Sequence, residues 1–168
     1  MMQNKLVLDI KHDQELAAQV ARLLVDKGLT LATAESCTGG AIGALLTSLA
    51  GSSSWFNGGV ISYTNSSKIN LLGVQSRLID KHGAVSQEVV ERMATGGREA
   101  MTSDVCVAVS GIAGPGGGTA EKPVGSVWIA WCGNGTAVSS KLYHLSGDRK
   151  EVQSAAVRLA LKGIISRV

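Results

Sequence analysis

The stretch Thr33-Ala34-Glu35-Ser36-Cys37-Thr38-Gly39-Gly40 joins an apolar run at residues 29–34 to a run with helical spacing at residues 41–50. This order predicts a buried strand, a tight polar turn and a helix. A turn of this kind exposes a side chain at the strand end, beside backbone N–H groups that the start of a helix leaves without partners. The two glycines let a ligand approach the backbone closely.

Ser36 in this turn has two interpretations. It can be a nucleophile with an oxyanion site beside it, built from N–H groups near Thr38, Gly39 and Gly40. It can also be the N-cap of the following helix, a position that Thr38 could equally take. Glu35 should point to the other side of the strand end, which makes it a poor general base for Ser36.

The rest of the chain alternates helical and strand patterns. A first helix is expected from a cap at Asp13 to Gly28, and residues 1–11 are expected to form a partly ordered extension. A late hairpin with a turn at residues 133–135 adds antiparallel strands, so the whole chain, residues 1–168, predicts one α/β domain with a mixed sheet. The other expected strands are residues 59–63, 104–110, 125–132 and 137–145, and the other helices are residues 65–72, 75–82, 86–101 and 149–167.

Composition excludes several classes of protein. The length of 168 residues fits one domain, and the 16 Lys and Arg are scattered, which gives no case for nucleic-acid binding. The three cysteines lack CxxC spacing and no secretory signal is present, which predicts reduced thiols and a cytoplasmic protein. No apolar run is long enough for a membrane span. The three histidines share no ligand spacing, so no metal is expected, and His82 is expected to be structural.

A second polar stretch, Ser62-Tyr63-Thr64-Asn65-Ser66-Ser67-Lys68, crosses from a strand end into a helix that Asn65 or Ser66 can cap. Lys68 stands one turn into that helix and can reach back over the strand end. Burial there would lower its pKa, and the neutral amine would be a base for Ser36. The alternative is a solvated helix lysine with Tyr63 as a rim aromatic.

Two further features have open interpretations. The glycine-rich loop at residues 111–118 can hold a phosphate through its N–H groups or can be a plain mobile turn. Arg149 at a helix start opposes the helix dipole, which indicates that it binds a phosphate or a carboxylate; a surface ion pair with Glu or Asp is the alternative. The Gly96-Gly97 pair in an expected helix requires a closely packed neighbour, and a homo-oligomer interface could supply one.

Five segments taken together resemble the CinA C-terminal domain family over essentially the whole chain: TAESCTGG, GSSSWFNGGVISYTNSSK, GAVS, SGIAGPGGGTAEKPVGSVW and SGDR. The resemblance implies a three-layer α/β/α sandwich and the family's characterised activity, hydrolysis of nicotinamide mononucleotide to nicotinate mononucleotide and ammonia. It implies a small-molecule nucleotide as partner, no cofactor, no nucleic acid or membrane partner, and a homo-oligomer. The chain looks like the stand-alone form, without the larger N-terminal domain of full CinA proteins.

The resemblance also implies roles for individual residues. Ser36 and Lys68 match the family's catalytic serine and lysine, and Tyr63 is placed with them. Four residues depart from the pattern typical of the family: Thr64, Ser66, Ser67, and Ala120 where proline is usual. The residues implied in substrate binding are Thr38, Gly39, Gly40, Asn65, Gly114, Gly116, Gly117, Thr119 and Arg149.

A rival function stays open at this point. The fold and pocket could persist in a paralogue with negligible turnover that acts as a nucleotide-binding or interaction module, because catalysis needs a finer alignment than binding does. A phosphatase or phosphotransferase is disfavoured, since the sequence has no clustered acidic metal site.

Overall fold

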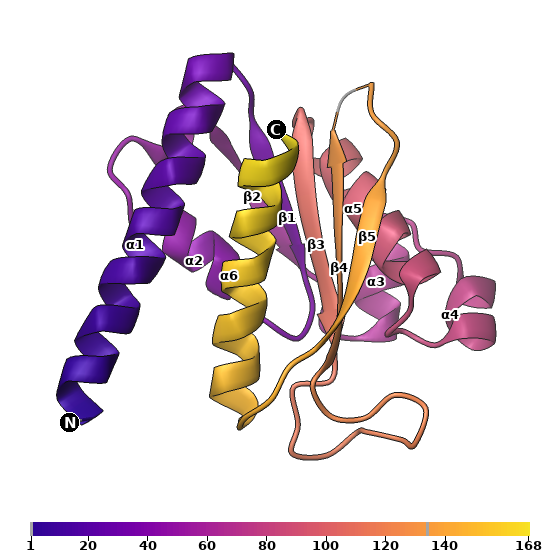
Figure 1. The fold of residues 1–168 in the computed structure, drawn as a ribbon. Helices are drawn as coiled ribbons and strands as arrows, with labels where there is room; N and C mark the ends of the chain where they lie inside the picture. The colour runs from indigo at the N-terminus through magenta and orange to yellow at the C-terminus, as the bar shows by residue number, and fades with distance from the viewer. Residues whose placement is uncertain (1, 134) are drawn as a thin grey trace.

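The computed structural model describes residues 2–133 and 135–168, and side chains from residue 10 onward within them. Five strands form one sheet in the order β2-β1-β3-β4-β5 (Figure 1). β1 is parallel to β2 and β3, whereas β4 is antiparallel to β3 and β5, so the predicted mixed sheet is confirmed. The strands are β1 (Leu31–Glu35), β2 (Phe56–Ile61), β3 (Val105–Gly111), β4 (Ser126–Gly133) and β5 (Ser139–His144).

Helices cover both faces of this sheet, which confirms the three-layer arrangement (Figure 1). Alternate side chains of β3 point to opposite faces. Val105 and Val107 join one core with α1, α2 and α6, while Cys106 and Ala108 join a second core with α3, α4 and α5. The helices are α1 (Met2–Lys27), α2 (Ala41–Thr47), α3 (Asn65–Leu72), α4 (Ser76–His82), α5 (Gln87–Met101) and α6 (Arg149–Arg167), with a 3-10 turn η1 (Ser52–Ser54).

The first helix differs from its predicted start. α1 begins at Met2, so residues 2–11 are helical and Asp13 does not cap the helix. The Asp13 carboxylate instead accepts hydrogen bonds from the Arg158 guanidinium at 2.5 and 3.2 Å, which ties α1 to α6. The predicted hairpin between β4 and β5 is confirmed, although the central residue of its expected turn, Asn134, lies outside the described residues.

The glycine pair of α5 packs inside the chain. A Cβ atom at Gly96 would overlap the backbone carbonyl of Leu72 at the end of α3, and one at Gly97 would lie 3.0 Å from the Cβ of Ala34. Both glycines are buried, so they meet α3 and the sheet rather than a partner helix. The predicted reason for a homo-oligomer is therefore wrong, and the oligomeric state itself stays a prediction.

α6 also approaches the sheet closely. Trp131 of β4 donates a hydrogen bond from Nε1 to the Ala160 carbonyl at 2.9 Å, and a Cβ atom at Gly163 would overlap the indole ring. The Arg167 guanidinium covers the ring at 4.0 Å. Through these contacts the C-terminal half of α6 packs closely against the sheet.

The register of the parallel strands gathers three chain segments at one edge. Glu35, the last residue of β1, pairs with Ile61 of β2 and Val109 of β3. Ser36 N–H donates to the Val109 carbonyl at 3.0 Å, and Ser62 N–H donates to the Glu35 carbonyl at 2.7 Å. Ligands of open α/β sheets bind outside the carboxyl ends of parallel strands, so this edge is where a site is expected.

Candidate active site

Ser36 and Lys68 meet at this edge. Lys68 Nζ lies 3.0 Å from Ser36 Oγ and donates a second hydrogen bond to the Ser62 carbonyl at 2.8 Å. The lysine is only 2% exposed, so the solvated interpretation is wrong. Three residues separate the end of β2 from the start of α3, and the first turn of α3 carries Lys68 back over the strand ends.

The surroundings of Lys68 favour a neutral amine. Burial lowers the pKa of Lys68 from its ordinary value of 10.5, and the nearby Cys37 thiol opposes this shift only as a smaller influence. Nζ donates hydrogen bonds to Ser36 Oγ and to the Ser62 carbonyl, and neither acceptor carries a net charge that would stabilise a protonated lysine. Within residues 10–133 and 135–168, no carboxylate forms a hydrogen bond or ion pair with Nζ.

The start of α2 is capped by neither Ser36 nor Thr38. Its N-cap residue is Gly40, with φ of 96° and no side-chain cap of its own. The Glu35 carboxylate takes this role, because Oε2 accepts from Gly40 N at 3.0 Å and from Ile42 N at 3.1 Å. Ser36 is thereby left to contact Lys68.

The backbone of the turn corrects the predicted oxyanion site. Gly39 N–H donates to the Ser36 carbonyl at 3.0 Å, and Gly40 N–H donates to Glu35, so both groups are already engaged. Within the described part of the chain, the N–H groups of Cys37 and Thr38 donate to no other residue, although the Cys37 N–H interacts with the sulfur of its own side chain. An oxyanion at Ser36 would therefore use these two donors rather than the glycines.

A cavity of about 220 Å³ opens at the Ser36–Lys68 pair. Arg149, the first residue of α6, closes one side of it. Its guanidinium donates to the Gly114 carbonyl at 2.9 Å and to the Tyr63 hydroxyl at 2.5 Å. The predicted capping box of Asp148 with Glu151 is confirmed and holds the start of α6. The lining residues are Ser36, Cys37, Tyr63, Asn65, Lys68, Ala84, Val85, Ser110, Gly111, Ala113 and Arg149.

The structure brings only part of the glycine loop to this cavity. Gly114 contacts it through Arg149, whereas Gly116, Gly117 and Thr119 are not among its lining residues. Thr119 forms an exposed turn with Lys122, in which each residue's N–H donates to the other, at 2.9 and 3.0 Å. Ala120, at the position where the family resemblance led us to expect proline, lies inside this turn.

The departures at residues 64–67 form a helix cap. The sequence predicts a cap at Asn65 or Ser66, but Thr64 caps α3: Thr64 Oγ1 accepts from Ser67 N at 3.1 Å, and Ser67 Oγ accepts from Thr64 N at 3.0 Å. This reciprocal cap satisfies donors at the helix start. It fixes the turn of α3 from which Asn65 and Lys68 reach the cavity.

Sequence reasoning missed several residues of the site. Cys37 lines the cavity as a buried thiol, and burial raises its pKa to about 11, which keeps it protonated. Ser110 lies near the carboxyl end of β3, as Ser36 lies at the end of β1, and it also lines the cavity. Its hydroxyl donates to the Ala84 carbonyl at 2.8 Å. The position of Ser110 at a strand end could have predicted that it lines the cavity. The capping of α2 by Glu35 could not be predicted, because it depends on where α2 lies relative to β1.

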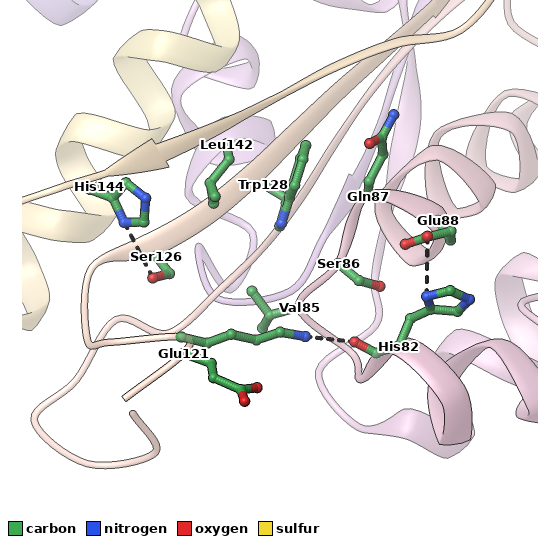
Figure 2. A pocket seen from close by; sticks show the side chains of 11 residues that line it. His82, Val85, Ser86, Gln87, Glu88, Glu121, Ser126, Trp128, Leu142 and His144 are labelled. Carbon is green, nitrogen blue, oxygen red and sulfur yellow. Dashed lines mark hydrogen bonds and ion pairs between the residues drawn. The ribbon is translucent and has the colours of Figure 1, made fainter. Parts of the chain in front are cut away.

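Figure 2 shows a larger cavity of about 370 Å³. It adjoins the first one, because Val85 lines both. It lies between the start of α5, residues 121–122 and the neighbouring strands β4 and β5. His82, predicted to be structural, lines it and pairs with Glu88 at 3.1 Å, while Lys122 Nζ donates to the His82 carbonyl at 2.5 Å. The described residues contain no group of three or more metal-ligating side chains, and no described helix is long and apolar enough to cross a membrane.

Comparison with known proteins places this chain and its fold in one family. At 45% identity over 152 residues, the chain matches the nicotinamide-nucleotide amidohydrolase PncC of Enterobacter agglomerans, covering 90% of this chain and 93% of that protein. A CinA-like protein of Synechococcus sp. (strain CC9902) is 51% identical, but the chain spans only 36% of its length. The crystal structure of a competence/damage inducible protein from Agrobacterium tumefaciens superposes with a TM-score of 0.89 at 41% identity, covering 94% of each chain. The model of the CinA C-terminal domain matches residues 13–168, and the chain belongs to this family.

Proposed function

We propose that this protein hydrolyses the carboxamide of nicotinamide mononucleotide with Ser36 as nucleophile and Lys68 as base. The observation that carries the proposal is the 3.0 Å contact between Lys68 Nζ and Ser36 Oγ in a site where the lysine is 2% exposed. The similarity to PncC nicotinamide-nucleotide amidohydrolases over nearly their full length supports the substrate.

The first half of the reaction transfers the acyl group to the enzyme. Neutral Lys68 takes the proton of Ser36 as Oγ attacks the carboxamide carbon. The carbonyl oxygen gains negative charge and accepts hydrogen bonds from backbone N–H groups of the turn. Lys68 then gives its proton to the amide nitrogen, the C–N bond breaks, and ammonia leaves.

The second half returns the enzyme to its starting state. Lys68 takes a proton from water as the water oxygen attacks the acyl carbon. The bond from the acyl carbon to Oγ breaks, Ser36 regains a proton from Lys68, and nicotinate mononucleotide is released. The reaction balances with water alone, so the proposal requires no cofactor.

Arg149 and its neighbours bind the rest of the substrate in this proposal. Two of the guanidinium N–H groups donate to the Gly114 carbonyl and the Tyr63 hydroxyl. The remaining N–H groups can donate to a phosphate oxygen. The Tyr63 hydroxyl accepts from Arg149 and can still donate its own proton to the substrate. Asn65 lines the same wall of the cavity.

Release of ammonia from nicotinamide mononucleotide tests the proposal. Ser36→Ala and Lys68→Met are expected to lower kcat/KM by about 10²-fold or more, as losses of a nucleophile and a general base do. Ser54→Ala and Lys150→Met remove an exposed serine and an exposed lysine outside the cavity, and both controls should retain wild-type release. Full activity in Ser36→Ala would contradict the mechanism, and binding of the nucleotide without ammonia release would favour a binding module.

A further inference from the structure

Glu35 is a buried carboxylate that the reaction above does not use. Its side chain is 1% exposed and accepts four hydrogen bonds. Oε2 accepts from Thr38 Oγ1 at 2.7 Å, and the two oxygens together accept from the backbone N–H groups of Gly40, Ile42 and Gly43 at 2.9 to 3.1 Å. The backbone of Glu35 is itself held between β2 and β3.

These contacts make one rigid unit of the strand end, the turn and the start of α2. The carboxylate also occupies the place where the N-terminus of α2 would otherwise attract an anion. A substrate oxygen therefore finds the N–H groups of Gly40, Ile42 and Gly43 already taken. Cys37 and Thr38 form the short link between Ser36 and the Thr38 hydroxyl that Glu35 holds. Among the described hydrogen bonds, the N–H groups of this link donate to no other residue, and the Cys37 N–H interacts only with its own sulfur.

We propose that Glu35 is a positioning residue for amide hydrolysis: it fixes this link so that the Cys37 N–H receives the carboxamide oxygen while Ser36 Oγ attacks the carbon. The inference rests on the proposed function. Cys37 lines the cavity beside Ser36, and in other serine hydrolases the N–H of the residue after the nucleophile is an oxyanion donor. Oxyanion donors act only when they are held within a fraction of an ångström of their working position.

The role of Glu35 is separable from that of Lys68. Glu35 forms no hydrogen bond with Lys68, and the influences that shift the pKa of Lys68 are burial and Cys37. Loss of the Glu35 carboxylate should therefore weaken stabilisation of the transition state and leave proton transfer unchanged. In kinetic terms kcat falls, while KM and the pH at which the acid limb of kcat/KM turns stay near their wild-type values.

Two variants and one matched control test this. Glu35→Gln removes the charge and sets an amide NH₂ against a backbone N–H, and we expect kcat to fall about 10- to 100-fold with KM within about threefold. Thr38→Val removes one of the four donors and should give a smaller fall. Asp104→Asn is the control, because the Asp104 carboxylate likewise accepts from a backbone N–H and a hydroxyl, those of Thr30 at 2.8 Å, at the opposite end of the strands.

A second readout does not depend on the substrate. A fluorophosphonate probe phosphonylates an activated serine: the Oγ–P bond forms, the P–F bond breaks, fluoride leaves and Lys68 takes the proton. The rate at which mass spectrometry detects labelled Ser36 should fall in Glu35→Gln and Thr38→Val and not in Asp104→Asn. Circular dichroism and thermal melting identify the folded variants.

The outcomes are distinct. Labelling of wild-type Ser36 without ammonia release would refute the proposed substrate, and slower labelling of the Glu35 variant would still support the positioning role. Wild-type kcat and labelling in a folded Glu35→Gln protein would overturn the inference. If Glu35→Gln fails to fold, Thr38→Val replaces it: a fall in kcat and in labelling rate supports the inference, and wild-type values of both overturn it. A wild-type protein with neither labelling nor turnover would overturn both proposals.

Discussion

Replacing Lys68 by methionine tests the central contact, because methionine keeps an unbranched side chain of similar length and removes only the amine. A general base contributes about 10²- to 10⁴-fold to a rate, which corresponds to about 2.7–5.5 kcal/mol of transition-state stabilisation. We expect the ammonia-release kcat/KM of Lys68→Met to fall by a factor in this range.

The same variant makes a prediction about stability. Burial lowers the pKa of Lys68 in the folded protein, while the unfolded lysine titrates near 10.5. Between these two pKa values the unfolded chain binds a proton that the folded chain does not bind, so folding stability rises with pH. Each unit of lowered pKa is worth about 1.4 kcal/mol, and Lys68→Met lacks this dependence.

Urea unfolding at about pH 7, 8.5 and 10 measures this difference. The free energy of unfolding of the wild type, minus that of Lys68→Met, should increase with pH by up to about 1.4 kcal/mol per unit, and the acid limb of wild-type kcat/KM should lie in the same pH window below 10.5. A difference that stays constant over this range would mean that the buried amine titrates normally, which would refute its assignment as a neutral base.

Three other substitutions have defined outcomes. Gly96→Ala places a methyl group against the Leu72 carbonyl, and urea unfolding should show a net loss of stability of about 1–2 kcal/mol; a more stable protein would contradict the packing described. Arg149→Lys keeps the charge and loses the planar fork that holds Gly114, so KM for nicotinamide mononucleotide should rise about tenfold, whereas an unchanged KM would remove Arg149 from substrate binding. Thr64→Ala deletes the α3 cap and should cost about 0.5–2 kcal/mol in thermal unfolding, with equal melting temperatures as the contrary result.

The order of strands and helices could be predicted from the sequence because local periodicity carries it. The spacing in α5 and the late hairpin both had clear signals, and the structure confirms them. The contact between Ser36 and Lys68 was different. It depends on the parallel pairing of Glu35 with Ile61, a tertiary register that no local pattern encodes. The residues alone offered the pair as one of two interpretations, and the family resemblance favoured it.

The capping of α2 shows why other details were out of reach. The alternation of side chains along β1 correctly predicted that Glu35 points away from Ser36. It could not show that the N-terminus of α2 lies on the side of the strand to which Glu35 points. A carboxylate that ends a strand thus capped the following helix, in place of the serine or threonine that propensity favours. Likewise, composition made residues 111–118 resemble a phosphate loop, but Gly116 and Gly117 are not among the residues that line the cavity.

The seat of α6 on Trp131 links two distant parts of the molecule. Gly163 has no side chain to keep the helix off the indole, and from there α6 runs roughly 20 Å, at about 1.5 Å per residue, to Arg149. A rigid helix of this length transmits a shift at one end to the other, so the close packing of Gly163 on the Trp131 indole helps to set where Arg149 lies at the edge of the cavity. If Arg149 binds the substrate as proposed, a larger side chain at Gly163 should weaken that binding although Gly163 lies at the far end of the helix.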